Sequence, residues 1–464
     1  MKQRTVPIVA LSTFLIVFQV FAQVDPGPRG GPANAGGPLN SVAANIDPPG
    51  ILNFFTAGQD AFVDVSSVKG PPVSPDDGLG PRFNSRSCVA CHSQPTIGGT
   101  SPFVNPQVAD ATANGATNTV PYFITINGPV REARFPTLVD AAGNPVAGVP
   151  DGHVHALYTI AGRVDQGTCT AAVISQPNFN RARDTNNIVF RIPSPVFGGG
   201  LIENIDDETL LAYRASLTGN TLGITPNFNR NGNDGTISRF GWKAQNKSLE
   251  LFAGEAYNVE MGVSNELSPQ ERPAPSEART TGLPAPCKLN QTPEDHTNLN
   301  SSSAAVDTPS DVTKFAMFMR MLKPPVQQVT GPNTAQIING EAIFTEVGCN
   351  KCHKVSFITG KSSITADLNN AEAKLFSDLA VHHMGSGLQD NIQQGTAQIT
   401  QFRTAPLWGV GQRIFFLHDG RTSSLVDAIT AHSSPGSEAN AVIANYNALT
   451  LANKQALIYY LRSL

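Results

Sequence analysis

Residues 336–353 read QIINGEAIFTEVGCNKCH, and the last five letters repeat a pattern, CVACH, found at residues 88–92. C-x-x-C-H is the attachment signature of c-type haem, in which two thiols bind the vinyl groups and the histidine reaches the iron. The chain has only six cysteines and nine histidines in 464 residues, so two chance copies are not expected. The sequence therefore predicts two covalently bound haem c groups. Their predicted attachment and ligand residues are Cys88, Cys91, His92, Cys349, Cys352 and His353.

Two other uses of paired cysteines fit this pattern less well. Zinc ribbons set their cysteine pairs about 15 to 20 residues apart, whereas 349 − 88 gives 261 residues here. A thioredoxin-like redox pair does not require a histidine after each second cysteine. Haem attachment is therefore the prediction that explains the whole pattern.

The sequence around the second motif predicts a compact helical unit. Apolar residues recur at helical spacing over 336–347, and Gly340 leaves room for a neighbouring helix or a porphyrin edge. Residues 452–464 carry a leucine stripe typical of a closing cytochrome helix. We therefore expect residues 326–464 to form a C-terminal cytochrome c-like domain.

The first motif lies in looser sequence, within an N-terminal haem domain predicted over residues 23–325. Strand-like runs separated by glycine and asparagine turns follow the motif, at 122–126, 153–160 and 188–192. The expected fold class is thus mainly α, with two cytochrome c-like haem domains and a loop-rich, partly β insertion between the haem motifs.

The second half of this N-terminal region is predicted to contain helices and one long excursion. Asp206 is expected to cap a helix over 208–216, and Asp311 is expected to cap another that runs to Leu322. Residues 267–310 are polar and Pro-rich, which predicts a linker or a long surface excursion.

The N-terminus predicts export. Residues 1–22 resemble a secretory signal peptide, with Lys2 and Arg4 ahead of an apolar run. Polar residues interrupt that run, and no other stretch reaches the length of a membrane span, so we expect an exported, periplasmic chain without a membrane anchor. Loss of these two cations changes the formal net charge from −4 to −6. A mildly acidic chain without a Lys/Arg cluster argues against nucleic acid or an anionic membrane as partner.

Several further motifs carry a family resemblance. Besides the first haem motif, they are Ile97–Gly99, Arg239–Gln245, Asp378–Gly385, Arg403–Trp408 and Phe416–Arg421. Together they resemble the di-haem oxidoreductases of peroxidase type, a branch of the bacterial di-haem cytochrome c peroxidase superfamily. The resemblance covers most of the chain after residue 22. It implies two cytochrome c-like domains that face each other, with one haem for electron transfer and one for chemistry.

The resemblance also suggests ligands for the two irons. It implies His92 and His353 as the proximal ligands. In the peroxidases the electron-transfer haem takes a methionine on the helix after a Phe-His-Asp-Gly motif, and His432 stands at the matching position here. We therefore expect His432 to be the sixth ligand of the second iron, with Met384 as the alternative. No histidine occurs between His92 and His153, so the first haem is expected to be open or capped from a distance.

Candidate catalytic residues are fewer and less specific. Glu203 and Glu132 are candidates for the acid/base that moves a proton between the two oxygens of a peroxide. A surface or capping carboxylate is the alternative for each. Trp242 is a candidate to carry electrons between the haems, as a bridging tryptophan does in the superfamily, and a core tryptophan is its alternative. Arg403 and Arg421 are candidates to pair with haem propionates, and solvated surface arginines are the alternative.

Two cysteines remain outside the haem motifs. In an exported protein Cys169 and Cys287 are expected to pair as a disulfide, with free buried thiols as the alternative. The sequence also leaves open an interdomain Ca²⁺ ion and the oligomeric state.

These observations predict an exported di-haem c-type cytochrome that acts as a peroxidase-type oxidoreductase. The haem at His92 would react with a small oxidant, peroxide or O₂, and the haem at His353 would pass electrons from an external donor. Two alternatives remain. One is a haem-dependent dioxygenase resembling the rubber-cleaving di-haem enzymes, and the other is a non-catalytic electron-transfer cytochrome.

Overall fold

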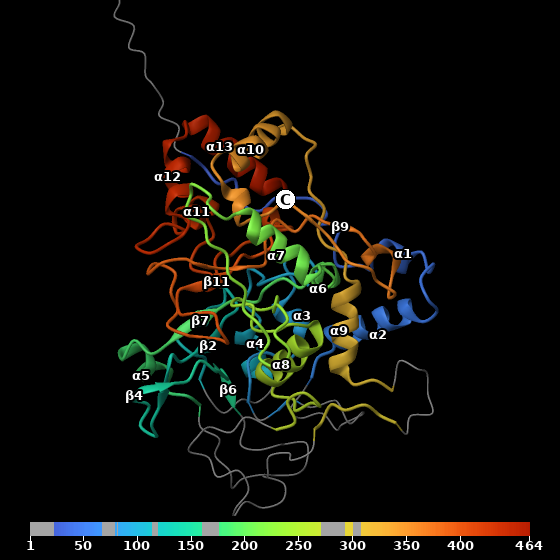
Figure 1. The fold of residues 1–464 in the computed structure, drawn as a ribbon. Helices are drawn as coiled ribbons and strands as arrows, with labels where there is room; N and C mark the ends of the chain where they lie inside the picture. Colours follow the sequence, from blue (N-terminus) through green and yellow to red (C-terminus); the bar gives the residue numbers. More distant parts are fainter. Residues whose placement is uncertain are drawn as a thin grey trace, which may run out of the picture.

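The computed structural model describes residues 23–66, 79–80, 82–113, 119–159, 176–270, 293–299 and 308–464. In these residues helices are the longer elements and all sheets are small (Figure 1). The helices are α1 (Asn40–Ala43), α2 (Ile51–Val63), α3 (Cys88–Cys91), α4 (Gln107–Ala113), α5 (Phe179–Asp184), α6 (Gly199–Glu203), α7 (Asp207–Ser216), α8 (Leu249–Met261), α9 (Asp311–Met321), α10 (Thr334–Glu346), α11 (Leu425–Thr430), α12 (Asn440–Ala448) and α13 (Leu451–Ser463).

In the residues that the structure describes, the strands form five small antiparallel sheets. β5-β2-β7 form the three-stranded sheet, and the pairs are β1-β6, β3-β4, β8-β9 and β10-β11. The strands are β1 (Arg82–Phe83), β2 (Glu132–Arg134), β3 (Thr137–Val139), β4 (Pro145–Pro150), β5 (Val154–His155), β6 (Tyr158–Thr159), β7 (Val189–Arg191), β8 (Phe357–Ile358), β9 (Glu372–Ala373), β10 (Val381–His383) and β11 (Gln401–Arg403).

Among the helix pairs that cross closely at a glycine, α10–α13 and α2–α9 each adjoin a haem motif. A Cβ atom on Gly340 of α10 would lie 2.2 Å from the carbonyl oxygen of Ala456 on α13. A Cβ atom on Gly58 of α2 would lie 2.3 Å from the carbonyl oxygen of Lys314 on α9. Real Cβ atoms do not approach carbonyl oxygens so closely, so both crossings require glycine. The expectation that Gly340 admits a neighbouring helix is confirmed, and α10 and α13 lie side by side in Figure 1.

Several predicted elements are found, with shifted boundaries. The run at 188–192 contains β7, and the run at 153–160 contains β5 and β6. The strand predicted over 122–126 is wrong, because those residues form turns in which buried Phe123 packs against Phe179 and Phe190. An apolar run that fills a core can therefore look like a strand.

The predicted helix caps also shift slightly. Asp206 stands at the N-cap position of α7, as expected, but its side chain forms no capping hydrogen bond. The cap of α9 is Ser310, whose Oγ accepts from the N–H of Thr313, and Asp311 is the first helical residue. The prediction that Asp311 caps this helix was therefore wrong by one position.

The fold is helical with small sheets, and the sheet β5-β2-β7 and the pair β3-β4 lie between the haem motifs as predicted. The pairs β8-β9 and β10-β11 lie after the second motif, where the sequence predicted a helical unit. The division into two cytochrome c-like domains remains a prediction. Residues 337–464 supply one apolar core, and a larger core takes side chains from both sides of residue 325. None of the described helices is long and apolar enough to cross a membrane. Residues 1–22, Cys169, Cys287 and most of 267–310 lie outside the described residues.

Candidate functional site

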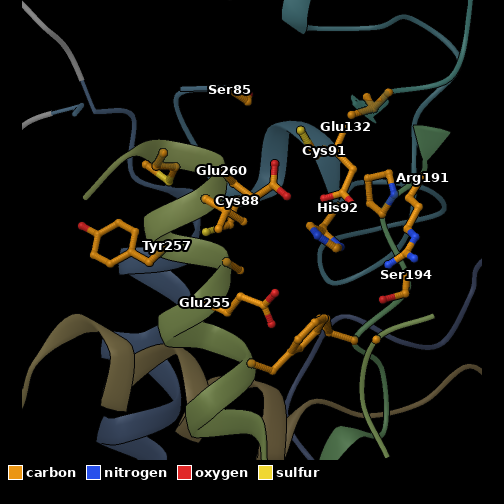
Figure 2. Close-up of a pocket in the computed structure, with 18 of the residues that line it drawn as sticks. Ser85, Cys88, Cys91, His92, Glu132, Arg191, Ser194, Glu255, Tyr257 and Glu260 are labelled. Carbon is orange, nitrogen blue, oxygen red and sulfur yellow. The ribbon is translucent and has the colours of Figure 1, made fainter. Parts of the chain in front are cut away.

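The first haem motif forms one wall of a cavity. Ser87 caps the short helix α3, with its Oγ accepting from the N–H of Ala90 at 3.3 Å, and this turn presents both motif cysteines. Cys88, Cys91 and His92 line a cavity that is open to solvent. Figure 2 shows Glu255 and Glu260 extending from α8 toward the side on which His92 lies.

His92 is held in one orientation. Its Nδ1 lies 3.0 Å from the carbonyl oxygen of Gly99. A carbonyl can only accept, so Nδ1 carries the proton and Nε2 keeps a free lone pair. Burial lowers the pKa of His92 to about 4, so the ring is neutral at physiological pH. A neutral imidazole fixed through Nδ1 is the form that ligates a metal through Nε2.

The second motif repeats this arrangement. Cys349, Cys352 and His353 line another cavity, which is also open to solvent. The Nδ1 of His353 lies 3.0 Å from the carbonyl oxygen of Phe376, and burial lowers the pKa of His353 to about 4. Each histidine also lies near a phenylalanine one helical turn past a crossing glycine, at ring-centroid distances of 6.1 Å for Phe62 and 6.5 Å for Phe344.

Both cavities fit a haem group. Each presents two thiols and one neutral imidazole on a wall, with a mainly apolar lining. The second cavity also contains the buried guanidinium groups of Arg403 and Arg413, and burial lowers the pKa of each to about 10. Neither arginine forms an ion pair with any residue that the structure describes. Two buried cations without carboxylate partners match the two propionates of a haem.

The first cavity contains a pair of carboxyl groups. Glu132 of β2 and Glu260 of α8 line it, and a hydrogen bond joins their side chains. Burial and the charge of Glu132 raise the pKa of Glu260 well above its ordinary value. Burial alone would raise the pKa of Glu132, but the guanidinium groups of Arg134 and Arg191 hold it below its ordinary value. One carboxylate and one carboxylic acid therefore share a proton in this cavity.

Two of the predicted site residues lie away from both cavities. Glu203, at the end of α6, forms an ion pair with Arg320 at 2.6 Å and accepts from the N–H of Leu249 at 2.8 Å. This geometry matches the capping alternative. Arg421 pairs with Asp419 at 2.8 Å. Neither Glu203 nor Arg421 is among the residues that line the two cavities.

Trp242 lines both cavities. Its indole Nε1–H donates to the carbonyl oxygen of Ile192 at 2.8 Å, and the N–H of Arg403 donates to the Trp242 carbonyl oxygen at 2.8 Å. The indole is buried and fixed in place between the two haem motifs. The structure thus brings Trp242 together with His92 on one side and His353 on the other.

Other histidines approach the second cavity. His432, two residues past the end of α11, is held by its Nδ1, which lies 2.7 Å from the carbonyl oxygen of Ala428. Burial lowers the pKa of His432, and its ring lies close enough to lower the pKa of His353 by charge. Met384 lines the same cavity. In the first cavity His92 is the sole histidine among the described lining residues, although Met261 and Met319 also line it.

Sequence reasoning did not single out Glu260, Arg413 or the buried His382. His382 contacts Asp378 at 3.0 Å and Glu438 at 2.9 Å, and it lines the second cavity. Burial alone would lower the pKa of His382, but Cys352 and the adjacent carboxylates raise it well above its ordinary value. Glu260 and Arg413 lie in stretches without a strong motif. In the described part of the chain, no group of three or more acidic, cysteine or histidine side chains is arranged to hold a metal ion.

A family model described as "Di-haem oxidoreductase, putative peroxidase" matches residues 156–464, about two thirds of the chain. Among curated proteins no significant match to the chain is found.

Three solved structures are distantly similar to the chain. The di-haem peroxidase BthA of Burkholderia thailandensis is 14% identical, with 90% of this chain and 86% of that chain covered and a TM-score of 0.34. Hydrazine synthase of Kuenenia stuttgartiensis is 18% identical over 35% of this chain and 56% of that chain, with a TM-score of 0.22. A MauG-like protein associated with microbial copper homeostasis is 18% identical over 33% of this chain and 52% of that chain, with a TM-score of 0.23. The matches span about half the length of the last two proteins.

Proposed function

The chain belongs to the family described as "Di-haem oxidoreductase, putative peroxidase", and from this premise we propose how its two cavities divide the work. Membership confirms the resemblance predicted from the motifs, and it makes the chain a haem-containing oxidoreductase of peroxidase type. We propose that the first cavity carries out the chemistry on a peroxide and the second passes electrons to it. The observation that carries this proposal is the paired carboxyl groups in the first cavity, beside a tryptophan that lines both.

Each cavity is proposed to hold a covalent haem c. The thiols of Cys88 and Cys91 would bind the first haem, and those of Cys349 and Cys352 the second. In each case the free Nε2 of the motif histidine would ligate the iron. Arg403 and Arg413 would neutralise the propionates of the second haem. When bound, a haem with an open iron position supplies ligand binding and electron exchange.

Glu260 is proposed as the proton donor of the first cavity. Its carboxyl group is half-buried in the cavity wall and keeps its proton because of desolvation and the neighbouring Glu132 charge. Reduction of a peroxide requires proton delivery to the leaving oxygen. Glu132 keeps its negative charge because its Oε1 lies 2.6 Å from Arg134 Nε. The Glu132 carboxylate can therefore accept the hydrogen bond from the Glu260 acid and can take up the proton that the two groups share. Of the two carboxylates predicted from the sequence, only Glu132 lines this cavity.

His432 is proposed as the sixth ligand in the second cavity. Its Nδ1 is engaged by the carbonyl oxygen of Ala428, which leaves Nε2 free, and its ring faces the cavity that His353 also lines. A pair of imidazole ligands gives a low-spin iron suited to electron transfer. Met384 stays the alternative. Trp242 would then conduct electrons between the two groups.

Export and the partners complete the proposal. The signal-like residues 1–22 support a periplasmic location with cleavage near Gln23. The two substrates would be a small peroxide and an external electron donor.

The deciding experiment measures ligand binding in the oxidised and reduced protein. We expect pyridine haemochrome to count two covalent haems per chain, and cyanide to bind one of them. Magnetic circular dichroism should then assign two nitrogen ligands to the other. If neither iron binds cyanide in either redox state, the proposal fails and the protein is an electron-transfer cytochrome. A methionine signature on the first iron would assign Met261 or Met319 as its sixth ligand and would equally contradict the open site.

A further inference from the structure

Lys243 follows Trp242 in the chain, yet its side chain has 0% exposure. Its Nζ lies 3.0 Å from Asp390 Oδ1, and it donates to the carbonyl oxygens of Gln398 at 2.9 Å and Gln401 at 3.0 Å. An ammonium group has three protons, and these three oxygen atoms can accept them. Lysine is almost never fully buried unless it is paired, and Asp390 is the partner that allows this placement.

The oxygen atoms around Nζ come from the chain segment that leads into β11. The ammonium group also lies 4.1 Å from the ring centroid of Phe402 in β11. The ring of Phe402 stacks on His418 at a centroid distance of 4.2 Å, and both residues line the second cavity. Lys243 therefore fixes one wall of the second cavity.

The same ammonium group is linked to the first cavity. Asp390 bridges Lys243 to Arg191, whose Nη2 lies 2.6 Å from Asp390 Oδ2. Arg191 lines the first cavity, and its side chain is 2% exposed. A chain of buried charges thus runs from one cavity to the other, directly beside Trp242.

We propose that Lys243 is a positioning residue for electron transfer between the two cavities. This inference rests on the proposed function, because it takes Trp242 to be the electron path. Without the ammonium group, the carbonyl groups of Gln398 and Gln401 and one oxygen of Asp390 would lose the donor that they share, and only backbone N–H groups would still reach Gln398 and Asp390. The segment 390–401 would move apart, and β11 would shift relative to Trp242. Electron tunnelling falls steeply with distance, so the transfer would slow.

Titration of Lys243 gives this role a measurable signature. Burial lowers the pKa of Lys243 to about 8, against the opposing effect of Asp390. Arg191 and Arg134 are the other charged groups that act on it. As pH rises through about 8, the ammonium group loses one of its three protons. The neutral amine that remains has one hydrogen-bond donor fewer. Inter-haem electron transfer in the wild-type protein should therefore slow across this pH range.

The test is inter-haem electron transfer in the full-length holoprotein after rapid photoreduction, followed by absorbance. Lys243→Met, which keeps the length of the side chain and removes the charge, should slow the transfer about tenfold or more and remove the pH step. Lys247→Met is the matched control, because Lys247 lies in the same segment with its side chain 35% exposed and pairs with Asp234. Its rate and pH profile should equal those of the wild type.

Two outcomes would overturn the inference. One is a wild-type rate and pH profile in Lys243→Met with both haems retained. The other is a wild-type protein without a pH step near 8, a measurement that does not depend on any variant folding. The variant Trp242→Phe tests the premise separately. If its inter-haem transfer rate equals that of the wild type, the proposed electron path fails. If the transfer slows in Trp242→Phe but not in Lys243→Met, only the role of Lys243 is refuted.

Discussion

At the scale of single residues, two half-buried carboxyl groups illustrate how position decides chemistry. Glu132 and Glu260 line the same cavity, yet neighbouring charges hold the pKa of one down while burial raises that of the other. Two like groups with separated pKa values are a common arrangement for acid and base roles. Glu203 has the same side chain, but its carboxylate is engaged in an ion pair with Arg320 and does not line the cavity.

We predict that Glu260→Gln slows peroxide reduction by about 10²- to 10⁴-fold, because the amide cannot deliver a proton. Haem content should not change. Glu203→Gln is the control and should keep near wild-type turnover, since Glu203 lies outside the cavity. Steady-state peroxide reduction with a reduced cytochrome donor measures both. Equal rates for Glu260→Gln and wild type would remove Glu260 from the mechanism.

The raised pKa of Glu260 predicts a pH dependence of the same reaction. The protonated form is the donor, so activity should be retained below the pKa of Glu260 and lost as pH rises through it. Because that pKa lies well above the ordinary carboxyl value, the loss should occur far above pH 4.5. Glu260→Gln should abolish this alkaline limb in a pH profile of kcat.

We predict that His432→Ala makes the second haem high-spin and accessible to cyanide, while haem attachment persists. His383→Ala is the matched control, because His383 bonds to Thr400 at 2.7 Å and does not line the cavity. Cyanide titration followed by absorbance should give two sites per chain in His432→Ala and one in His383→Ala. An unchanged low-spin spectrum in His432→Ala would favour Met384 as the ligand.

At the scale of elements, close helix crossings determine where the haem motifs lie. α10 meets α13 at Gly340, and α2 meets α9 at Gly58, with no space for a side chain at either crossing. In each pair one helix, α10 or α2, comes shortly before a C-x-x-C-H motif in the chain. The crossing therefore fixes the position from which the motif reaches its cavity.

Gly340→Ala should destabilise the protein by about 1–3 kcal/mol, because the added methyl group would overlap the carbonyl of Ala456. The better helix propensity of alanine offsets about 0.5–1 kcal/mol of any such cost. Gly232→Ala is the control, since no atom lies within 4 Å of its added Cβ. Chemical denaturation measures both. Equal midpoints would show that the helices can separate without cost.

At the scale of the whole molecule, the first described residues contact the last helix, α13. Asp25 pairs with Arg462 of α13 at 2.7 Å and accepts from the N–H of Leu425 at 2.6 Å, at the start of α11. Tyr446 donates to Gln23 at 2.7 Å. Residues near the start of the chain therefore support the helices around the second cavity.

Replacing Arg462 with Met should cost about 3–5 kcal/mol, because Asp25 would keep a buried charge without its partner. The double variant Asp25→Asn/Arg462→Met should recover part of that loss. Burial alone would raise the pKa of Asp25, but Arg462 and two backbone N–H groups lower it below 3.8. The contribution of this carboxylate is therefore present above about pH 3.8 and lost as pH falls below it. Thermal unfolding between pH 3 and 7 should show this acid loss in the wild type and a smaller one in the double variant.

The sequence by itself determined the haem motifs, the helices α10 and α13 and the family. Covalent haem attachment needs its residues at fixed local spacing, and amphipathic helices show their period in the chain, so both can be read without the fold. A continuous strand at 122–126 was wrong for a related reason: an apolar run predicts burial, while its neighbours in space decide whether it is extended.

Only the tertiary structure decided which side chains share a cavity. Glu132 and Glu260 are 128 residues apart in the chain and hydrogen-bonded in space. Arg403 faces the second cavity while Arg421 pairs with Asp419 outside it, although both stand in motifs that carry the family resemblance. Lys243 looks like a surface lysine in the sequence and is fully buried in the fold. These residues converge from loops and short strands without a periodic pattern, so their partners depend on packing between distant segments rather than on local spacing.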